Sequence, residues 1–280
     1  MPRFTSYDGT TLAFSTVGDG KPLVCLPGGP GRAVAYLEDL AGLSARRQLV
    51  LLDPRATGFS EVPADPATLR FDRLALDVEA LRGELGLEQL DVLAHSAGCI
   101  VAQAWASAHP AHVGSLVLVT PSDLLQGGSR ADVAAVRETF ADEPWYAEAA
   151  DAADAIEDAP PSQVAGLERM MRPFFYGRWD ERTQQHAASA DRQTSKRALL
   201  GFGAGAEEVD VPALLSGLSA VAAPVTVVGA TRDTLTGLAS VDVVASSFPT
   251  AAIAWVEGAG HFPWVDDASA FRTLLSPHLV

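Results

Sequence analysis

Residues 90–98 read LDVLAHSAG, and this stretch decides the fold that we expect for the chain. An apolar run leads to a serine between small residues, and the sequence after it, CIVAQAWA, is typical of a helix. A serine on a sharp turn between a strand and a helix has a strained backbone, which only small neighbours accommodate. We therefore predict that Ser96 is a nucleophile, with Ala94 standing where this pattern commonly has glycine.

Short apolar runs recur along the chain on both sides of this serine. They lie near residues 23–26, 49–52, 90–93, 115–119, 225–229 and 252–256. None of them alternates with polar residues, which is typical of strands buried on both faces of a parallel sheet. Helical segments separate most of the runs, including one with an apolar stripe at Leu74, Val78, Leu81 and Leu85. This alternation of strands and helices favours a doubly wound α/β fold. A hairpin over residues 3–14 precedes it, because Asp8-Gly9 is a turn signal.

Residues suited to chemistry follow four of these runs directly. They are Pro27, Ser96, Asp233 and His261. In a doubly wound sheet, ligands bind at the carboxyl ends of the strands. We therefore expect these four positions to converge at one edge of the sheet.

Four further motifs accompany the serine: PGGPG at residues 27–31, DPRATGFS at 53–60, VTVVGATRD at 225–233 and EGAGHFPW at 257–264. Together they resemble the alpha/beta-hydrolase superfamily, and in particular proline iminopeptidases and their relatives. The resemblance covers nearly the whole chain and is weakest over residues 122–205. It implies an alpha/beta-hydrolase fold, with a mostly parallel eight-stranded sheet and a helical lid inserted after the sixth core strand.

The change of rhythm along the chain predicts three segments. Residues 1–121 and 206–280 form the hydrolase core, and residues 122–205, rich in Ala, Asp, Glu and Arg, form the lid. Within the lid, residues 147–157 carry little apolar surface, so we expect a solvated helix or a mobile loop there.

A catalytic triad is the arrangement that the motifs favour. A serine hydroxyl must lose its proton to a base as it attacks, and His261, in a loop with glycines on the preceding turn, is the candidate. The imidazole needs a carboxylate to hold its tautomer. Asp233 is our choice, and Asp123, which follows the preceding strand, is the rival. The order Ser, Asp, His is the one this fold uses.

The tetrahedral intermediate needs preorganised donors. We expect the backbone amides of Gly29 and Ala97 to form this oxyanion hole, with Gly28 and Gly31 giving the loop its freedom. Pro27 stands where the family usually has histidine, which changes the hydrogen bonding that supports the loop.

We expect supporting roles for the other polar residues of these motifs. His95 adjoins the nucleophile without being the base, Asp53 anchors a turn, and Arg55 pairs with an acid. The residues that we expect to contact substrate are Gly28, His95, Phe175 and Trp179.

Composition narrows the partners. The chain has 280 residues, of which 48% are hydrophobic, so it can bury a large core. A net charge of −15 disfavours nucleic acids and anionic membranes as partners. The start lacks the apolar core of a signal peptide, and Cys25 and Cys99 are expected to be buried free thiols, so we expect a cytoplasmic protein. No dinucleotide, phosphate-loop or metal-spaced motif is present, so neither a cofactor nor a metal is expected.

These observations predict a cofactor-free serine hydrolase that cleaves an ester or amide bond of a small molecule through an acyl-enzyme on Ser96. An esterase or lactonase is the first candidate. The resemblance also implies a proline iminopeptidase-type aminopeptidase, which would hold a substrate ammonium with acidic residues of the lid: Glu168, Asp180, Glu181 and Glu207. A lyase or other proton-transfer enzyme with the same triad, and a non-catalytic ligand receptor, are the remaining alternatives.

Overall fold

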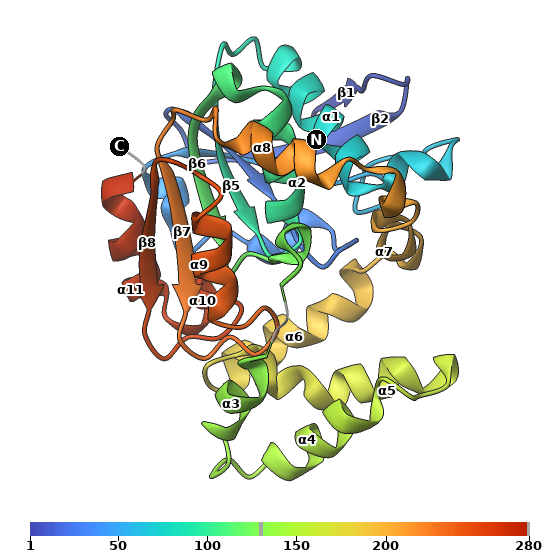
Figure 1. The fold of residues 1–280 in the computed structure, drawn as a ribbon, viewed down its shortest axis with the longest axis vertical. Coiled ribbons are helices and arrows are strands. Elements are labelled where there is room, and N and C mark those ends of the chain that lie inside the picture. Colours follow the sequence, from blue (N-terminus) through green and yellow to red (C-terminus); the bar gives the residue numbers. More distant parts are fainter. Residues whose placement is uncertain (129–130, 279–280) are drawn as a thin grey trace.

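An eight-stranded sheet forms the centre of the molecule (Figure 1). The computed structural model describes residues 1–128 and 131–278. The strands are β1 (Arg3–Thr5), β2 (Thr11–Val17), β3 (Pro22–Leu26), β4 (Gln48–Leu52), β5 (Leu90–His95), β6 (Val113–Val119), β7 (Val225–Ala230) and β8 (Ala251–Val256). Their order across the sheet is β1-β2-β4-β3-β5-β6-β7-β8.

The pairing of the strands confirms the predicted α/β architecture. β1 pairs with β2, and β2 with β4, in antiparallel fashion, whereas every later pair is parallel. All six apolar runs form strands, and the hairpin supplies the other two. The expectation of burial on both faces is wrong for β8, in which Ala252 and Ile253 are exposed, because this strand lies at the edge of the sheet.

Helices cover both faces of the sheet. One face packs on α1 (Phe71–Glu84), α2 (Gly98–Ala108), α8 (Val211–Leu218) and α9 (Ala239–Ala245), and the other packs on α10 (Pro263–Asp266) and α11 (Ala268–Leu275). Successive strand residues point to opposite faces. In β3, Val24 and Leu26 therefore join the first hydrophobic cluster, whereas Leu23 and Cys25 join the second. The sheet is buried between two cores and is held rigidly beneath its carboxyl edge.

Between β6 and β7 the described residues form six α-helices, of which the last, α8, packs on the sheet. We call the segment that holds the other five, together with their connections, the insert. These five are α3 (Val133–Glu138), α4 (Tyr146–Ala155), α5 (Pro161–Met171), α6 (Glu181–Gln193) and α7 (Lys196–Phe202). Figure 1 shows α3 to α6 gathered beyond the carboxyl ends of the strands. None of the described helices has both the length and the hydropathy that are needed to cross a bilayer.

One prediction about this insert is wrong in part. Residues 147–157 largely form helix α4, but the helix is not solvated all round, because Ala149, Ala152 and Ala153 are buried. Ala149 packs with Phe174, and the other two alanines pack with Met171. Alanine has little apolar surface, so a helix face made of alanines is not recognised as a buried face from the hydropathy of the sequence. Its small side chain nevertheless allows a neighbouring helix to approach closely.

Both cysteines are free and buried, as the sequence predicts. Burial raises the pKa of the Cys25 and Cys99 thiols. They are thus protonated at neutral pH and behave as small apolar side chains of the core.

Asp53 and Arg55 have structural roles below the site. The Asp53 carboxylate accepts the amides of Val34 at 3.0 Å and Phe59 at 3.0 Å, and this anchors the turn after β4. Arg55 is fully buried, and its guanidinium pairs with Asp77 at 2.6 Å and with Asp8.

Replacing Arg55 should destabilise the fold. Arg55→Met leaves the carboxylate of Asp77, 2% exposed, without its cation, and removing one partner of a buried pair costs about 3–5 kcal/mol. Urea unfolding would measure the loss. Arg73→Met, which removes a half-exposed arginine beside Asp72, is the control and should change stability by less than about 1 kcal/mol. Equal effects of the two substitutions would contradict the stabilising role of Arg55.

Candidate active site

Ser96 lies on the turn between β5 and α2, in a left-handed backbone conformation with a φ of 55°. Such a φ is strained for a residue with a side chain and is a known mark of functional sites. Neighbouring backbones approach this turn closely. A Cβ atom added at Gly98 would lie 2.5 Å from the Pro27 carbonyl oxygen, and one added at Gly28 would lie 2.7 Å from the Ser96 Cβ. Glycine is therefore required at both positions for the loop and the serine turn to pack together.

The loop at residues 27–31 brings backbone amides to the serine. A Cβ atom added at Gly28 would lie 3.1 Å from the Ala97 amide nitrogen, so this loop and the start of α2 are in contact. Gly29 has a φ of 119°, which residues with side chains rarely adopt. Within residues 1–128 and 131–278, the amides of Gly29 and Ala97 donate no hydrogen bond. Both predicted donors are thus unengaged beside Ser96.

Gly28 has its backbone donor engaged within the protein. Its amide donates to the Tyr36 hydroxyl at 2.6 Å, and it does not line the cavity above Ser96. Its backbone donor thus holds the loop, and the expected contact of Gly28 with substrate stays a prediction.

His261 and Asp233 are hydrogen-bonded to each other. Nδ1 of the imidazole lies 3.1 Å from Oδ1 and 3.0 Å from Oδ2 of the carboxylate. Both side chains are buried, and His261 follows β8 while Asp233 follows β7. The amide of His261 also donates to the Phe175 carbonyl at 2.9 Å, which fixes the loop against the insert.

The surroundings of Asp233 keep it ionised. Burial alone would raise the pKa of this carboxyl, but the neighbouring His261 and hydrogen bonds from Thr236 and Leu235 outweigh burial and lower it. The Thr236 hydroxyl donates to Oδ2 at 2.6 Å, and the Leu235 amide donates to Oδ1 at 2.8 Å. Asp233 can therefore hold the Nδ1–H tautomer of His261 and leave Nε2 free to act as a base.

The rival acid lies elsewhere. Asp123 is buried in the turn after β6, where its backbone carbonyl accepts from the amides of Gln126 and Gly128 at 2.9 and 3.1 Å. The carboxylate that the structure places on the His261 ring is that of Asp233.

His95 connects the two loops that meet at Ser96. Its Nε2 lies 2.9 Å from the His261 carbonyl oxygen and its Nδ1 lies 2.7 Å from the Tyr36 hydroxyl. A carbonyl only accepts, so Nε2 carries the proton and Nδ1 accepts from Tyr36. Burial, with His261 nearby, lowers the pKa of His95 well below its usual value and keeps the ring neutral.

Sequence reasoning missed Tyr36, which completes this network. Its hydroxyl accepts from Gly28 and donates to His95, so the loop at 27–31 is tied through two side chains to the backbone of His261. Pro27 has no side-chain donor for this purpose. A buried tyrosine in the short helix at Val34–Leu37 carries no sequence signal that separates it from an ordinary core residue.

A cavity of about 480 Å³ opens above the serine. Ser96 and His261 lie in its wall together with Gly29 and His95, and the insert contributes many of the remaining wall residues. Phe175 lines the cavity, whereas Trp179 does not and instead packs on Tyr176 with ring centroids 5.7 Å apart. Hydropathy alone does not tell which face of the insert an aromatic ring occupies, and the geometry favours Phe175 over Trp179 as a residue that contacts substrate.

Three of the four acidic residues proposed for a substrate ammonium lie away from the cavity. Asp180 caps α6 by accepting from Thr183 at 3.1 Å, and Glu181 accepts from Gln185 at 3.1 Å. Glu207 is exposed in the short helix at Ala206–Glu208. Only Glu168 of the four lines the cavity, and it is exposed to water.

Asp266 joins the insert to the loop of His261. Its Oδ2 accepts from the amides of Gly177 at 2.9 Å and Gly260 at 2.7 Å, whereas Oδ1 is buried and has no partner among the described residues. Burial, against the effect of these amides, raises the pKa of Asp266 to about 6.

This shift predicts a pH dependence of stability. A carboxyl whose pKa is raised by folding stabilises the native state at low pH, and that contribution is lost as pH rises through about 6. Asp266→Asn removes the titration. We expect the free energy of unfolding of the wild type to fall, relative to the variant, by about 2–3 kcal/mol between pH 4 and pH 7. Urea unfolding of both proteins at each pH would test this, and parallel curves would contradict it.

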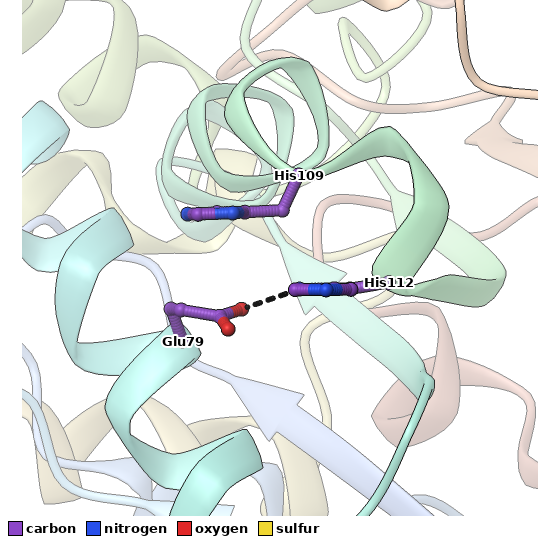
Figure 2. A group of neighbouring side chains, drawn as sticks. All are labelled: Glu79, His109 and His112. Carbon is purple, nitrogen blue, oxygen red and sulfur yellow. Dashed lines mark hydrogen bonds and ion pairs between the residues drawn. The ribbon is translucent and has the colours of Figure 1, made fainter.

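One cluster outside this cavity holds three groups that can ligate metals. Glu79, His109 and His112 offer ligand atoms that lie within 4.8 Å of one another, and Figure 2 shows the two imidazoles stacked beside the carboxylate. The glutamate, however, already accepts from Trp105 at 3.1 Å and from Arg82 at 2.7 Å. Burial would raise the pKa of Glu79, but Arg82, Trp105 and His112 lower it to about 2. No spacing in the sequence predicts this cluster, because Glu79 lies on α1, whereas His109 and His112 lie in the segment after α2.

Known proteins resemble this chain in sequence and in fold. The sequence model of the family described as alpha/beta hydrolase fold matches residues 21–268. A stretch of 108 residues is 32% identical to a proline iminopeptidase of Heyndrickxia coagulans, and it covers 39% of this chain and 38% of that relative. The resemblance to proline iminopeptidases is therefore confirmed, over a part of their length.

Solved structures of low sequence identity share the fold. A proline iminopeptidase of Mycobacterium smegmatis aligns with a TM-score of 0.75 at 20% identity, over 99% of this chain and 97% of that one. The esterase EaEST of Exiguobacterium antarcticum aligns with a TM-score of 0.74 at 17% identity, over 99% and 98% of the two chains. With the strand order, the strained serine turn and the match over residues 21–268, these similarities lead to one conclusion: the chain belongs to the alpha/beta hydrolase family.

Proposed function

We propose that this protein is a cofactor-free serine hydrolase that cleaves an ester bond of a small molecule through an acyl-enzyme on Ser96. The observation that carries the proposal is the meeting of three loops at one cavity. Ser96 has the strained φ of 55°, unengaged amides lie beside it, and His261 in the same cavity wall is held by Asp233 at 3.0 Å.

The chemistry follows from these groups. The Ser96 oxygen attacks the substrate carbonyl carbon, and its proton passes to Nε2 of His261 as the new C–O bond forms. The amides of Gly29 and Ala97 stabilise the oxyanion of the tetrahedral intermediate. His261 then gives its proton to the leaving oxygen. Water, deprotonated by His261, attacks the acyl-enzyme in the second half, and this releases the acid and restores the Ser96 hydroxyl.

The insert has a separate task in this proposal. It supplies Phe175 and Ala187 to the cavity wall, but the proposed triad and oxyanion donors all lie outside it. We expect the insert to choose the substrate and to exclude water, as lids do, rather than to take part in bond breaking.

A nucleophile-partitioning experiment tests the acyl-enzyme. The protein is incubated with 4-nitrophenyl butyrate or phenyl butyrate in water containing methanol, and the ratio of methyl butyrate to butyrate among the products is measured. A common acyl-enzyme has already lost the leaving group, so the two substrates should give the same ratio. A ratio that changes with the leaving group, or the absence of turnover with both esters, would contradict the proposal. Partitioning in buffer without protein supplies the background ratio.

An aminopeptidase is the second candidate, because the relative from Heyndrickxia coagulans is a proline iminopeptidase. Prolyl-naphthylamide measures this activity directly. Of the four acidic candidates, only the exposed Glu168 lines the cavity. We therefore expect the kcat/KM for prolyl-naphthylamide to be lower than the kcat/KM for 4-nitrophenyl butyrate. The reverse order would assign the chain to the peptidases.

A further inference from the structure

Arg32 is a buried cation in the wall of the cavity that holds Ser96. Its side chain follows the loop that supplies Gly29, one of the two predicted oxyanion donors, and the residue is 6% exposed. A Cβ atom added at Gly29 would lie 3.1 Å from the Arg32 Cβ, so the arginine is an immediate neighbour of the predicted oxyanion hole.

Neutral groups hold the guanidinium in place. Nε donates to Gln193 at 3.0 Å, and Nη2 donates to the Ser189 hydroxyl at 2.9 Å and to the His186 carbonyl at 3.3 Å. One face of the group lies on the Tyr36 ring, with Cζ 4.2 Å from the ring centroid. The orientation of Arg32 is therefore fixed by α6 and by the core before any substrate arrives.

One end of the guanidinium is left for a ligand. Nη1 of Arg32 donates no hydrogen bond to any of the described residues, 1–128 and 131–278. It is also not fully buried. Nη1 is therefore accessible, and Arg32 is one of the residues that line the cavity.

The charges around the cavity do not neutralise Arg32. Arg169 and Arg172 both pair with Asp191. Glu168, the remaining acid of the lining, is exposed to water, where its field is screened. No carboxylate of the described residues lies within 4.0 Å of the Arg32 guanidinium. The cavity lining holds three arginines, and only two carboxylates, those of Glu168 and Asp191, to balance them.

An unpaired buried cation calls for an anion. Removing a charge from water costs free energy unless an opposite charge or metal compensates, and the guanidinium fork matches a carboxylate closely. The cost of holding Arg32 in this wall is offset when a ligand brings the missing negative charge. A substrate ammonium would instead meet repulsion.

We infer that Arg32 binds a carboxylate of the substrate, so that the natural substrates are esters that carry a free carboxylate close to the scissile bond. The inference rests on the proposed function of Ser96. Arg32, Gly29 and Ser96 line the same cavity, so one small molecule can present its carboxylate to Arg32 and its scissile carbonyl to Ser96. Arg32 thereby sets specificity and takes no part in bond breaking.

Two matched pairs of esters test the inference. On the acyl side, 4-nitrophenyl hydrogen glutarate is compared with 4-nitrophenyl methyl glutarate. On the leaving-group side, 4-acetoxybenzoate is compared with its methyl ester. For at least one pair, the wild type should have a kcat/KM for the anion about 10- to 100-fold above that for the neutral ester, as expected for a charge-assisted hydrogen bond.

Substitutions show whether Arg32 produces this preference. In Arg32→Met the anion-to-neutral ratio should fall about 10-fold or more, and Arg32→Lys, which keeps the charge, should retain part of it. Arg182→Met is the control, because it removes an α6 cation that pairs with Glu38 outside the cavity lining. Its ratio should equal that of the wild type. A merely structural role of Arg32 would lower both rates together and leave the ratio unchanged.

The outcomes separate this inference from the proposed function. If the wild type hydrolyses the esters but prefers neither anion, or if Arg32→Met keeps the wild-type ratio, the inference is wrong and the serine hydrolase stands. If the wild type hydrolyses none of the four esters and Ser96 takes up no fluorophosphonate, the proposed function fails, and the inference fails with it. The wild-type ratios decide the matter even if Arg32→Met does not fold.

Discussion

Ser96→Ala should lower kcat by about 10⁵- to 10⁶-fold, the size of loss seen when a serine nucleophile is removed from a triad. The substitution deletes the attacking oxygen and leaves His261 and Asp233 in place. Stability should change by less than about 1 kcal/mol, since the hydroxyl of the buried Ser96 makes no hydrogen bond among the described residues and a methyl group remains at the same φ of 55°.

Steady-state hydrolysis of 4-nitrophenyl butyrate and urea unfolding measure the two effects of Ser96→Ala. The control is Ser189→Ala. This substitution removes a hydroxyl on α6 that donates to the His186 carbonyl and accepts from Arg32. Its loss of kcat should be smaller by several orders of magnitude. A folded Ser96→Ala protein with more than about a tenth of wild-type kcat would show that the nucleophile lies elsewhere.

Asp233→Asn should lower kcat by about 10⁴-fold, as the equivalent change does in a serine protease triad. An asparagine amide can donate to Nδ1, and this holds His261 in the tautomer whose Nε2 carries a proton and cannot act as the base. The geometry of the loop should survive, because the asparagine oxygen still accepts from the amides of Leu235 and Thr236 at 2.8 and 3.2 Å.

Asp123→Asn is the matched comparison for Asp233→Asn. Both aspartates are buried and both follow strands at the same edge of the sheet, but Asp233 is the one on the His261 ring. We expect Asp123→Asn to change kcat by less than about tenfold. Circular dichroism must show that both variants are folded, and a larger loss in Asp123→Asn would move the acid to the earlier strand.

The sheet was predictable because its signals are local. Unalternating apolar runs such as residues 49–52 and 225–229 are typical of strands buried in a parallel sheet. Residues that follow such strands meet at the carboxyl edge of the sheet. For the same reason the sequence alone places Ser96, Asp233 and His261 together, since each of them follows a strand.

The cavity wall was less predictable, because its residues come from segments far apart in the sequence. Arg32 and Tyr36 gain their positions from α6, β5 and the loop of His261, and no local pattern reports those contacts. Trp179 and Asp180 have residue types that suit a binding site, but neither lines the cavity. Trp179 packs on Tyr176, and Asp180 caps α6.

Helix–helix contacts within the insert were also hidden from sequence reasoning. The alanines of α4 have a weak hydropathy signal, although packing against Phe174 and Met171 buries them. A segment whose apolar face is made of alanine therefore has the sequence pattern of a solvated helix.

Covalent labelling tests most directly whether Ser96 is an activated nucleophile. The protein is treated with a fluorophosphonate, and its intact mass and peptide map are then measured for the wild type, Ser96→Ala and Asp233→Asn. A serine activated by His261 should add one phosphonate, on the peptide that contains Ser96, at a rate that falls sharply in Asp233→Asn. Ser96→Ala should add none. Labelling of another residue, or an unlabelled wild type under conditions in which a known serine hydrolase reacts fully, would contradict the proposed role of Ser96.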